Sequence, residues 1–195
     1  MFSASVVGSS SPARPVVFVM IGAAAAAVVA AVILAAVSLW SPVHALSAPF
    51  APSEASGHIE DAASLADAEL PAIALLDPAL LSAMRDAATA AGADGVAFEV
   101  TSGWRSRAYQ QWLLDDAIVE YGSEEIARQF VATPDRSRHV TGHAIDIGGL
   151  DAQSWLIQHG AQWGICQIYA NERWHFELAT EPGGVCPDLL PDAGG

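Results

Sequence analysis

The chain of 195 residues has no lysine and only two cysteines, and its eight positively charged side chains are all arginines. Arg14 precedes a long apolar run, whereas the other seven arginines and all 22 acidic residues follow it. A domain this acidic repels phosphate backbones, so we expect no nucleic-acid partner. Two cysteines are too few for a disulfide scaffold, although they are enough for a single cross-link.

Charge and proline are both absent from residues 16–40, a run of 25 residues. As a helix the run would be about 37 Å long, which exceeds the roughly 30 Å of a bilayer's hydrocarbon core. We therefore expect a transmembrane anchor, and Arg14 favours a cytoplasmic tail over residues 1–15. The expected product is a single-pass protein of the cell membrane with an extracytoplasmic domain. The alternative is a signal peptide that is cleaved near Ala45 and releases that domain.

The segment after the apolar run is poor in large hydrophobic residues. Residues 41–57 are rich in Pro, Ser and Ala, and residues 58–69 are acidic and Ala-rich, with some helical propensity. We expect a flexible linker over residues 41–70. The remaining length suits one modest domain, which we place at residues 71–190.

Helix signals and short apolar runs are mixed in this domain, without the regular alternation of parallel sheets. The order predicts an α+β fold with a small, mostly antiparallel sheet and flanking helices. Expected helices lie at 77–92, 106–122, 124–131 and 151–160, and expected strands at 96–101, 144–147, 165–169 and 174–178. The second helix should bury an apolar stripe of Tyr109, Trp112, Leu113, Ala117 and Tyr121.

The run SRHVTGHAIDIG, residues 137–148, contains His139, His143 and Asp146. Its glycine and β-branched residues disfavour a helix, so we expect a turn that leads into a strand. In that strand His143 faces the opposite side from Asp146, and the two should not bind the same ion. The run NERWHFEL, residues 171–178, adds His175 between two glutamates. Two imidazoles, a carboxylate and one open position make a catalytic zinc site, so the two runs together predict a metal centre.

These residues resemble the zinc D-alanyl-D-alanine peptidases of the VanY and VanX type. The matching elements are Ser137-x-His139-x-x-Gly142-x-Ala144-x-Asp146, then Glu172-x-Trp174-His175, and upstream TSGWRSRAYQ from Thr101 to Gln110. The resemblance covers roughly residues 71–190. It implies the small antiparallel sheet with flanking helices that these peptidases share with the Hedgehog signalling domain.

The resemblance also implies roles for individual residues. His139, Asp146 and His175 would bind one zinc ion per chain. Glu172 would be the general base, with Glu177 as its rival because a strand places Glu177 on the same face as His175. The remaining candidates are Arg105 as the oxyanion donor and Ser137 and Gln110 as substrate-binding residues.

Two departures from the family pattern bear on the substrate. Arg138 stands where many relatives have an acid, which we expect to alter substrate preference. The interval between Asp146 and His175 is short, so we expect a lid found in some relatives to be missing and the groove to be open.

The implied activity is that of a D-alanyl-D-alanine carboxypeptidase acting on peptidoglycan stem peptides. The alternatives are an L,D-carboxypeptidase or D,D-dipeptidase of the same fold, or a non-catalytic wall-binding module. An open groove disfavours the dipeptidase. The sequence does not indicate an oligomeric state.

Cys166 and Cys186 would meet an oxidising environment in an exported domain, where disulfides form and persist. We expect a bridge that ties the Pro- and Gly-rich tail to the strand that begins near Cys166, with a stabilisation of about 3 kcal/mol from loop closure. The alternatives are two free thiols or thiolate ligands of the zinc. Thiolate ligands are disfavoured because a fourth protein ligand would close the site to water.

Overall fold

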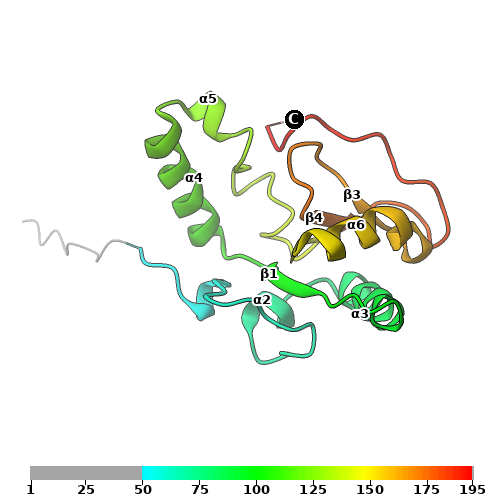
Figure 1. Cartoon of the computed structure of the whole chain (residues 1–195). Coiled ribbons are helices and arrows are strands. Elements are labelled where there is room, and N and C mark those ends of the chain that lie inside the picture. The colour runs from blue at the N-terminus through cyan, green and yellow to red at the C-terminus, as the bar shows by residue number, and fades with distance from the viewer. Residues whose placement is uncertain (1–49, 195) are drawn as a thin grey trace, which may run out of the picture. The chain divides into compact units, whose positions relative to one another are not determined.

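The computed structural model describes residues 50–194, which fold around one small antiparallel sheet (Figure 1). The strand order is β1-β2-β4-β3, and every neighbouring pair is antiparallel. The strands are β1 (Glu99–Ser102), β2 (Ala144–Gly148), β3 (Ile165–Gln167) and β4 (His175–Leu178). The helices are η1 (Glu54–Ser56), α2 (Pro71–Ala74), α3 (Pro78–Ala93), α4 (Arg107–Tyr121), α5 (Glu124–Ala127), α6 (Leu150–His159) and η2 (Gly160–Trp163). The predicted α+β class is confirmed.

The expected tail at 1–15 and membrane helix at 16–40 lie outside the described residues, and both stay predictions. Within residues 50–194, no helix combines the length and the apolar character needed to cross a bilayer.

Capping residues explain where the two longest helices begin. The Asp77 side chain accepts hydrogen bonds from two backbone N–H groups of the first turn of α3, at 2.9 and 3.1 Å. Ser106 caps α4 in the same way, and Gly122 ends that helix with φ 67°. The helix expected at 151–160 begins one residue earlier, at Leu150, because Gly149 turns the chain directly after β2 with φ 75°.

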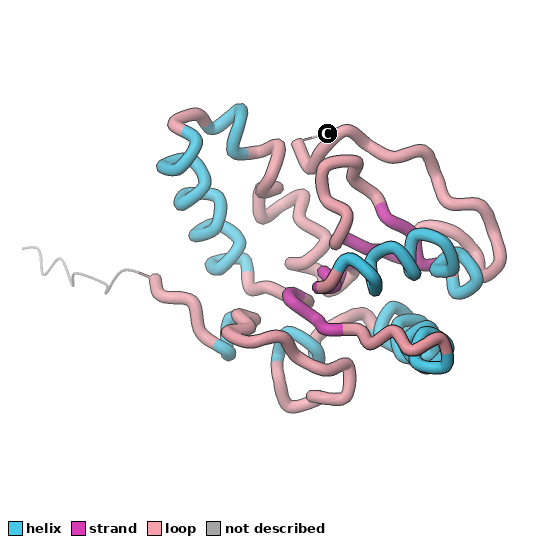
Figure 2. The backbone as a smooth tube through the Cα atoms, viewed as in Figure 1, coloured by secondary structure: helices cyan, strands magenta, loops and turns pink. Residues whose placement is uncertain are grey.

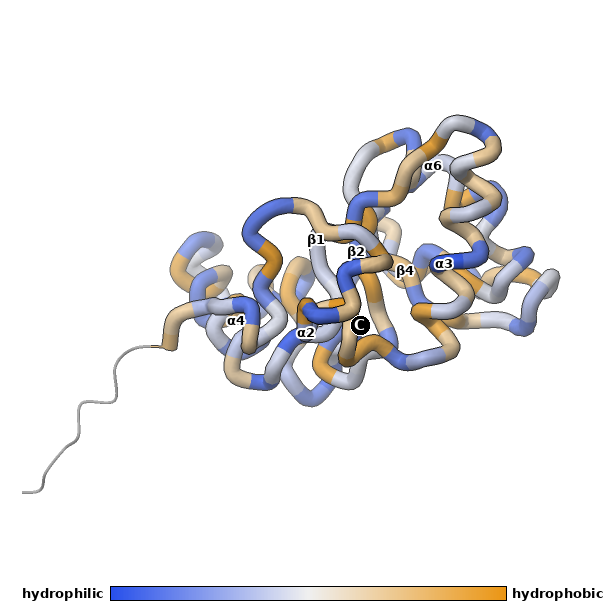
Figure 3. The backbone as a smooth tube through the Cα atoms, turned by 90° about the horizontal axis from the view of Figure 1, so that it is seen from below, coloured by the Kyte–Doolittle hydropathy of each residue, from blue (hydrophilic) through white to orange (hydrophobic). Residues whose placement is uncertain are grey.

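The buried stripe of α4 differs from the expected one. Tyr109 and Ala117 are buried as predicted, but Leu114 replaces Leu113 in the core, and Tyr121 is 39% exposed. Leu114 and Ala117 pack with Ala127 of α5 into a small cluster separate from the main core. The buried face of α4 is therefore set by α5. Hydrophobic and hydrophilic residues alternate within the helix, as Figure 3 shows.

Alternation along the strands gives the sheet one apolar and one polar face. Ile145 and Ile147 of β2 point into the main core together with Phe176 of β4. This core lies between the sheet and helices α3 and α6, which lie close together in Figure 2. The opposite face presents the polar side chains Ser102, Asp146, His175 and Glu177.

The expected linker is wrong for residues 50–70, which belong to the domain. Ala63 pairs with Val100 of β1 through two backbone hydrogen bonds of 2.9 and 2.8 Å. Ser56 accepts the backbone N–H of Ser106 at 2.9 Å, at the start of α4. Gly57, with φ 89°, packs so closely against the Trp104 carbonyl that a side chain there would collide with it. The small residues of this segment permit close packing, and no helix forms over residues 58–69.

The predicted disulfide between Cys166 of β3 and Cys186 is confirmed. It attaches the C-terminal segment, residues 183–194, beside the sheet, where this segment runs past β3 in Figure 1. Leu190 exchanges backbone hydrogen bonds with Ile168 and Ala170, at 2.9 and 2.8 Å. The C-terminal segment is therefore fixed to the same chain region that leads into β4.

Candidate metal centre and active site

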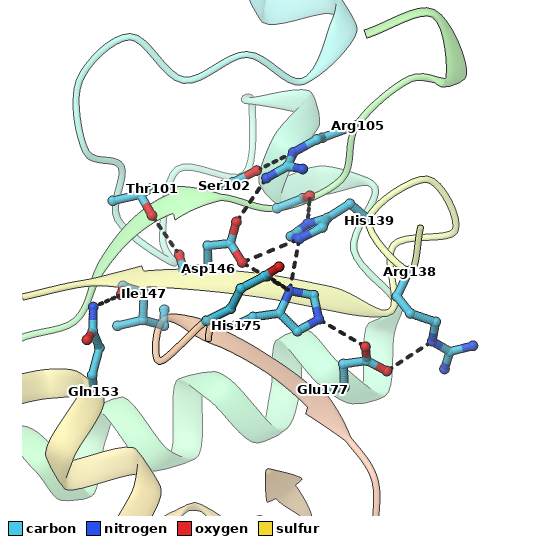
Figure 4. Close-up of polar contacts among 12 residues, drawn as sticks. Thr101, Ser102, Arg105, Arg138, His139, Asp146, Ile147, Gln153, His175 and Glu177 are labelled. Carbon is cyan, nitrogen blue, oxygen red and sulfur yellow. Dashed lines mark hydrogen bonds and ion pairs between the residues drawn. The ribbon is translucent and has the colours of Figure 1, made fainter. Parts of the chain in front are cut away.

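Three buried side chains converge on the polar face of the sheet (Figure 4). Asp146 and His175 are direct cross-strand partners in β2 and β4, and His139 comes from the loop before β2. His139 Nε2 lies 3.2 Å from His175 Nδ1, and Asp146 Oδ1 lies 3.3 Å from each of these nitrogens. Ligands about 2.0–2.1 Å from a tetrahedral zinc ion lie about 3.3–3.4 Å apart, so the separations fit this ion.

The far nitrogens of both imidazoles are oriented by hydrogen bonds. His139 Nδ1 lies 2.8 Å from the Gly103 carbonyl oxygen, which can only accept, so this nitrogen must carry the proton. His175 Nε2 donates to Glu177 Oε1 at 2.9 Å. In the neutral rings, the two facing nitrogens then present lone pairs to each other and to a carboxylate oxygen. Three acceptors that face one another favour a cation between them, which can be a proton or a metal ion.

Asp146 is oriented by the arginine on its other side. Arg105 Nη2 donates to Asp146 Oδ2 at 2.9 Å, which leaves Oδ1 for the metal position. Oδ1 is buried and has no hydrogen-bond partner among the described residues. Arg105 also donates from Nε to Ser102 at 2.8 Å and from Nη1 to Gln110 at 3.2 Å. All three nitrogens of its guanidinium are therefore bonded to the protein.

The pKa values reflect the same preference for a cation. Burial raises the pKa of Asp146, but His139, His175 and Arg105 outweigh burial and hold it well below its usual range. Burial lowers the pKa of His175, yet the carboxylates of Asp146 and Glu177 beside it prevail and raise it to about 9. The pKa of His139 is lowered by burial and by Arg105. The two carboxylates that stabilise a proton on His175 would equally stabilise a metal ion in its place.

Glu172 lies in the turn that precedes β4 and is 6% exposed. Its Oε2 lies 3.8 Å from His175 Nδ1, and its buried Oε1 has no hydrogen-bond partner among residues 50–194. Burial raises the pKa of Glu172 to about 7, with His175 and Arg105 opposing the shift and Asp146 adding to it. A carboxylate beside the metal position with a pKa near neutrality can accept and return a proton.

A cavity of about 70 Å³ opens onto this centre. Residues that are distant from one another in the sequence line this cavity. They include Arg105, Gln110, Phe130, Ser137, Arg138, Tyr169, Trp174 and Ala193. The open groove expected from the short interval before His175 stays a prediction.

The structure brings together every residue predicted for the site. His143 is outside the cluster as expected, with Nδ1 3.0 Å from Thr141 Oγ1 and Nε2 3.7 Å from Asp77. Glu177, the rival base, instead lies behind His175 and accepts a hydrogen bond from its Nε2. Gln110 was expected to bind the substrate. Instead, its side-chain oxygen accepts a hydrogen bond from Arg105, and its side-chain nitrogen donates to the Ala132 carbonyl at 2.8 Å.

Sequence reasoning missed several contributors to the site, among them Gly103, Tyr169 and Ala193. Gly103 acts through its carbonyl, for which residue type gives no signal. Tyr169 packs its ring against His175 with centroids 5.0 Å apart. Ala193 reaches the cavity wall from the C-terminal segment. Only the disulfide at Cys186 could have suggested that this segment lies near the site.

Comparison with known proteins gives concordant matches. The family model of VanY, D-alanyl-D-alanine carboxypeptidase, matches residues 74–182. A D-alanyl-D-alanine carboxypeptidase of Enterococcus faecalis is 30% identical over an alignment of 118 residues, and the match covers 48% of this chain and 44% of that protein. The chain thus spans less than half the length of this curated relative.

Two solved structures are also similar. One is a mutant of the D,D-pentapeptidase VanY from a VanB-type vancomycin resistance cassette, in complex with Zn(II). It is 29% identical with a TM-score of 0.49, and the match covers 52% of this chain and 71% of that one. The other is the L,D-carboxypeptidase DacB from Streptococcus pneumonia, which is 27% identical with a TM-score of 0.43 over 52% and 65% of the two chains.

Proposed function

This chain belongs to the VanY family of D-alanyl-D-alanine carboxypeptidases, and from that premise we propose that it is a zinc-dependent carboxypeptidase. Its proposed substrate is the D-Ala-D-Ala end of a peptidoglycan stem peptide, from which it removes the terminal residue. The main support is the convergence of three acceptor atoms at 3.2–3.3 Å beside a buried glutamate whose Oε1 has no hydrogen-bond partner among residues 50–194. A non-catalytic wall-binding module would need the metal ligands but not this glutamate.

The metal ligands in this proposal are His139 Nε2, Asp146 Oδ1 and His175 Nδ1. The set of two imidazoles and one carboxylate is that of a catalytic zinc site with an open fourth position. When bound, zinc would polarise the scissile carbonyl and lower the pKa of water to roughly 7. One ion per chain is expected, because residues 50–194 contain a single such cluster.

We assign proton transfer to Glu172. Its carboxylate lies beside the metal position, where it can take a proton from the attacking water and deliver that proton to the leaving amine. Its unpartnered Oε1 has no competing hydrogen bond to break before it does so. Glu172 is 6% exposed, which limits its contact with bulk water.

Arg105 combines two tasks in this scheme. It fixes Asp146 through Oδ2, and one N–H on each of its Nη atoms is left to stabilise an oxyanion in the cavity. Gln110 would act on the substrate indirectly, because it orients Arg105. Ser137 is buried in the cavity wall and is the proposed direct substrate contact.

We also infer that the domain works outside the cytoplasm. The disulfide between Cys166 and Cys186 suits an oxidising compartment, and the apolar run at 16–40 would provide the membrane anchor. Protease treatment of intact cells would test this placement, because a domain on the outer side should be digested without lysis.

The function is tested with purified zinc-loaded protein and synthetic stem pentapeptides ending in D-Ala-D-Ala. Mass spectrometry should show loss of one alanine, whereas release of a dipeptide would contradict the carboxypeptidase assignment. His175→Ala should lose both zinc and activity. His143→Ala, which removes an imidazole outside the cluster, should keep both and serves as the matched control. Wild-type activity after complete removal of the metal would overturn the zinc assignment.

A further inference from the structure

Arg138 lines the cavity beside the metal ligand His139 and is only partly used by the protein. Its Nε donates to Glu177 Oε2 at 3.0 Å, and 46% of its side chain is exposed. Within residues 50–194 no hydrogen bond involves its Nη1 or Nη2. Figure 4 shows the guanidinium of Arg138 joined to Glu177 through Nε.

We propose that the paired Nη atoms of Arg138 form a subsite for a carboxylate of the peptide substrate. This inference rests on the proposed function and specifies which end of the peptide the site prefers. Binding of Nε to Glu177 orients the planar group, so a second carboxylate can approach the free edge in a bidentate manner. The side chain then needs little additional ordering when the substrate arrives.

The other charged groups of the cavity make this arginine necessary for an anionic substrate. Asp146 and Glu172 line the same cavity, and Glu177 lies directly behind it. A peptide carboxylate that enters would be repelled by these acids unless a fixed cation faces it. Arg105, the other arginine of the cavity wall, has each of its three nitrogens bonded to protein, and its remaining Nη N–H groups are assigned to the oxyanion.

The carboxylate has two possible sources within one peptide. Every carboxypeptidase substrate has a terminal carboxylate, and a peptide can also have an acidic side chain further along. The chemistry recognised by Arg138 is the same in both cases. The subsite therefore predicts a preference for a free acid over the corresponding amide at one of these two positions.

The experiment compares Arg138→Gln with wild type on three peptides that end in D-Ala-D-Ala. The first has a free terminal acid and no other carboxylate, the second is its terminal amide, and the third has a terminal amide and an acidic side chain. Arg107→Gln is the matched control, because it removes the same charge from an arginine that is 62% exposed and pairs with Asp135. The readouts are kcat/KM, KM alone, and zinc content.

We expect Arg138→Gln to lose about 10- to 100-fold in kcat/KM, mainly through KM, on whichever peptide has the recognised carboxylate. Its activity on the plain amide should equal that of wild type, and Arg138→Lys should recover part of the loss. A loss on the free acid identifies the terminal carboxylate, and a loss on the third peptide identifies the side chain. Equal losses on all three peptides, or no loss on any, would overturn the subsite.

Binding separates this proposal from the proposed function. Calorimetry of the same peptides with zinc-loaded protein should show tighter binding of the peptide that has the recognised carboxylate than of the plain amide, and Arg138→Gln should abolish the difference. A chain that cleaves none of the peptides but shows this pattern refutes the carboxypeptidase assignment and supports the subsite. Equal binding of all three peptides by wild type refutes the subsite, whatever the activity.

Discussion

Replacement of Glu177 by Gln should weaken zinc binding while leaving the catalytic step intact. Glu177 Oε1 accepts a hydrogen bond from His175 Nε2 at 2.9 Å, which keeps Nδ1 available for the metal. A glutamine oxygen can occupy the same place, but a neutral acceptor makes a hydrogen bond only about half as strong. Loss of such a ligand-orienting carboxylate typically costs about 10- to 100-fold in metal affinity, or roughly 1.4–2.7 kcal/mol.

The assay is a competition between the protein and a chromogenic chelator, titrated with zinc at constant pH. At saturating zinc, Glu177→Gln should cleave peptide with kcat within about threefold of wild type, since it does not touch the reacting water. Glu172→Gln should show the reverse pattern, with near wild-type zinc affinity and a loss of about 10²- to 10⁴-fold in kcat. Glu181→Gln is the control, because it removes the same charge from an exposed position.

Two results would refute this reasoning. Wild-type zinc affinity in Glu177→Gln would mean that the hydrogen bond to His175 does not orient the ligand. Loss of turnover at saturating zinc in Glu177→Gln, with turnover retained in Glu172→Gln, would make Glu177 the base.

Two further predictions concern stability. Cys186→Ser opens the loop closed by the disulfide between residues 20 positions apart. It should lower the free energy of unfolding by about 3 kcal/mol and Tm by about 6–12 °C, measured by chemical and thermal denaturation; a change below about 1 kcal/mol would contradict it. The second concerns metal-free protein, where the pKa of His175 is raised to about 9. A raised pKa stabilises the fold fully below about pH 6.5, the value in the unfolded chain, and this stabilisation is lost as pH rises through 9. Tm of chelator-treated protein should therefore fall as the pH rises across this range. Tm of zinc-loaded protein should not show this fall. The same pH dependence of Tm with and without zinc would exclude a metal at His175.

Much of the site could be predicted because its signals are local. Period-two alternation placed Asp146 opposite His143, and side-chain caps placed the starts of α3 and α4. The role of Glu177 could not be predicted, since facing the same side as His175 is compatible with a base and with a supporting acceptor. Only the distance from Oε1 to Nε2 distinguishes the two. The same limit applies to Gly103, whose contribution is a backbone carbonyl.

The segment at 50–70 was misjudged for a different reason. Its Ala, Ser and Gly content is also that of flexible linkers, and composition does not reveal whether small residues are exposed or packed. Gly57 is needed because the Trp104 backbone lies against it, and this contact joins residues that are distant in the sequence. Ala193 was missed in the same way, since its place in the cavity wall depends on the path of the C-terminal segment.

The pairing of Ala63 with Val100 bears on how the domain avoids aggregation. A sheet of four strands has two outer edges, and bare backbone N–H and C=O groups at an edge can recruit a strand from another molecule. Ala63 covers the outer edge of β1, and the C-terminal segment is attached beside β3 through Cys186. Both covering segments lie outside residues 74–182, the part that matches the family model. A fragment trimmed to that match would keep every proposed zinc ligand and expose the edge of β1, so it should associate edge to edge into insoluble assemblies.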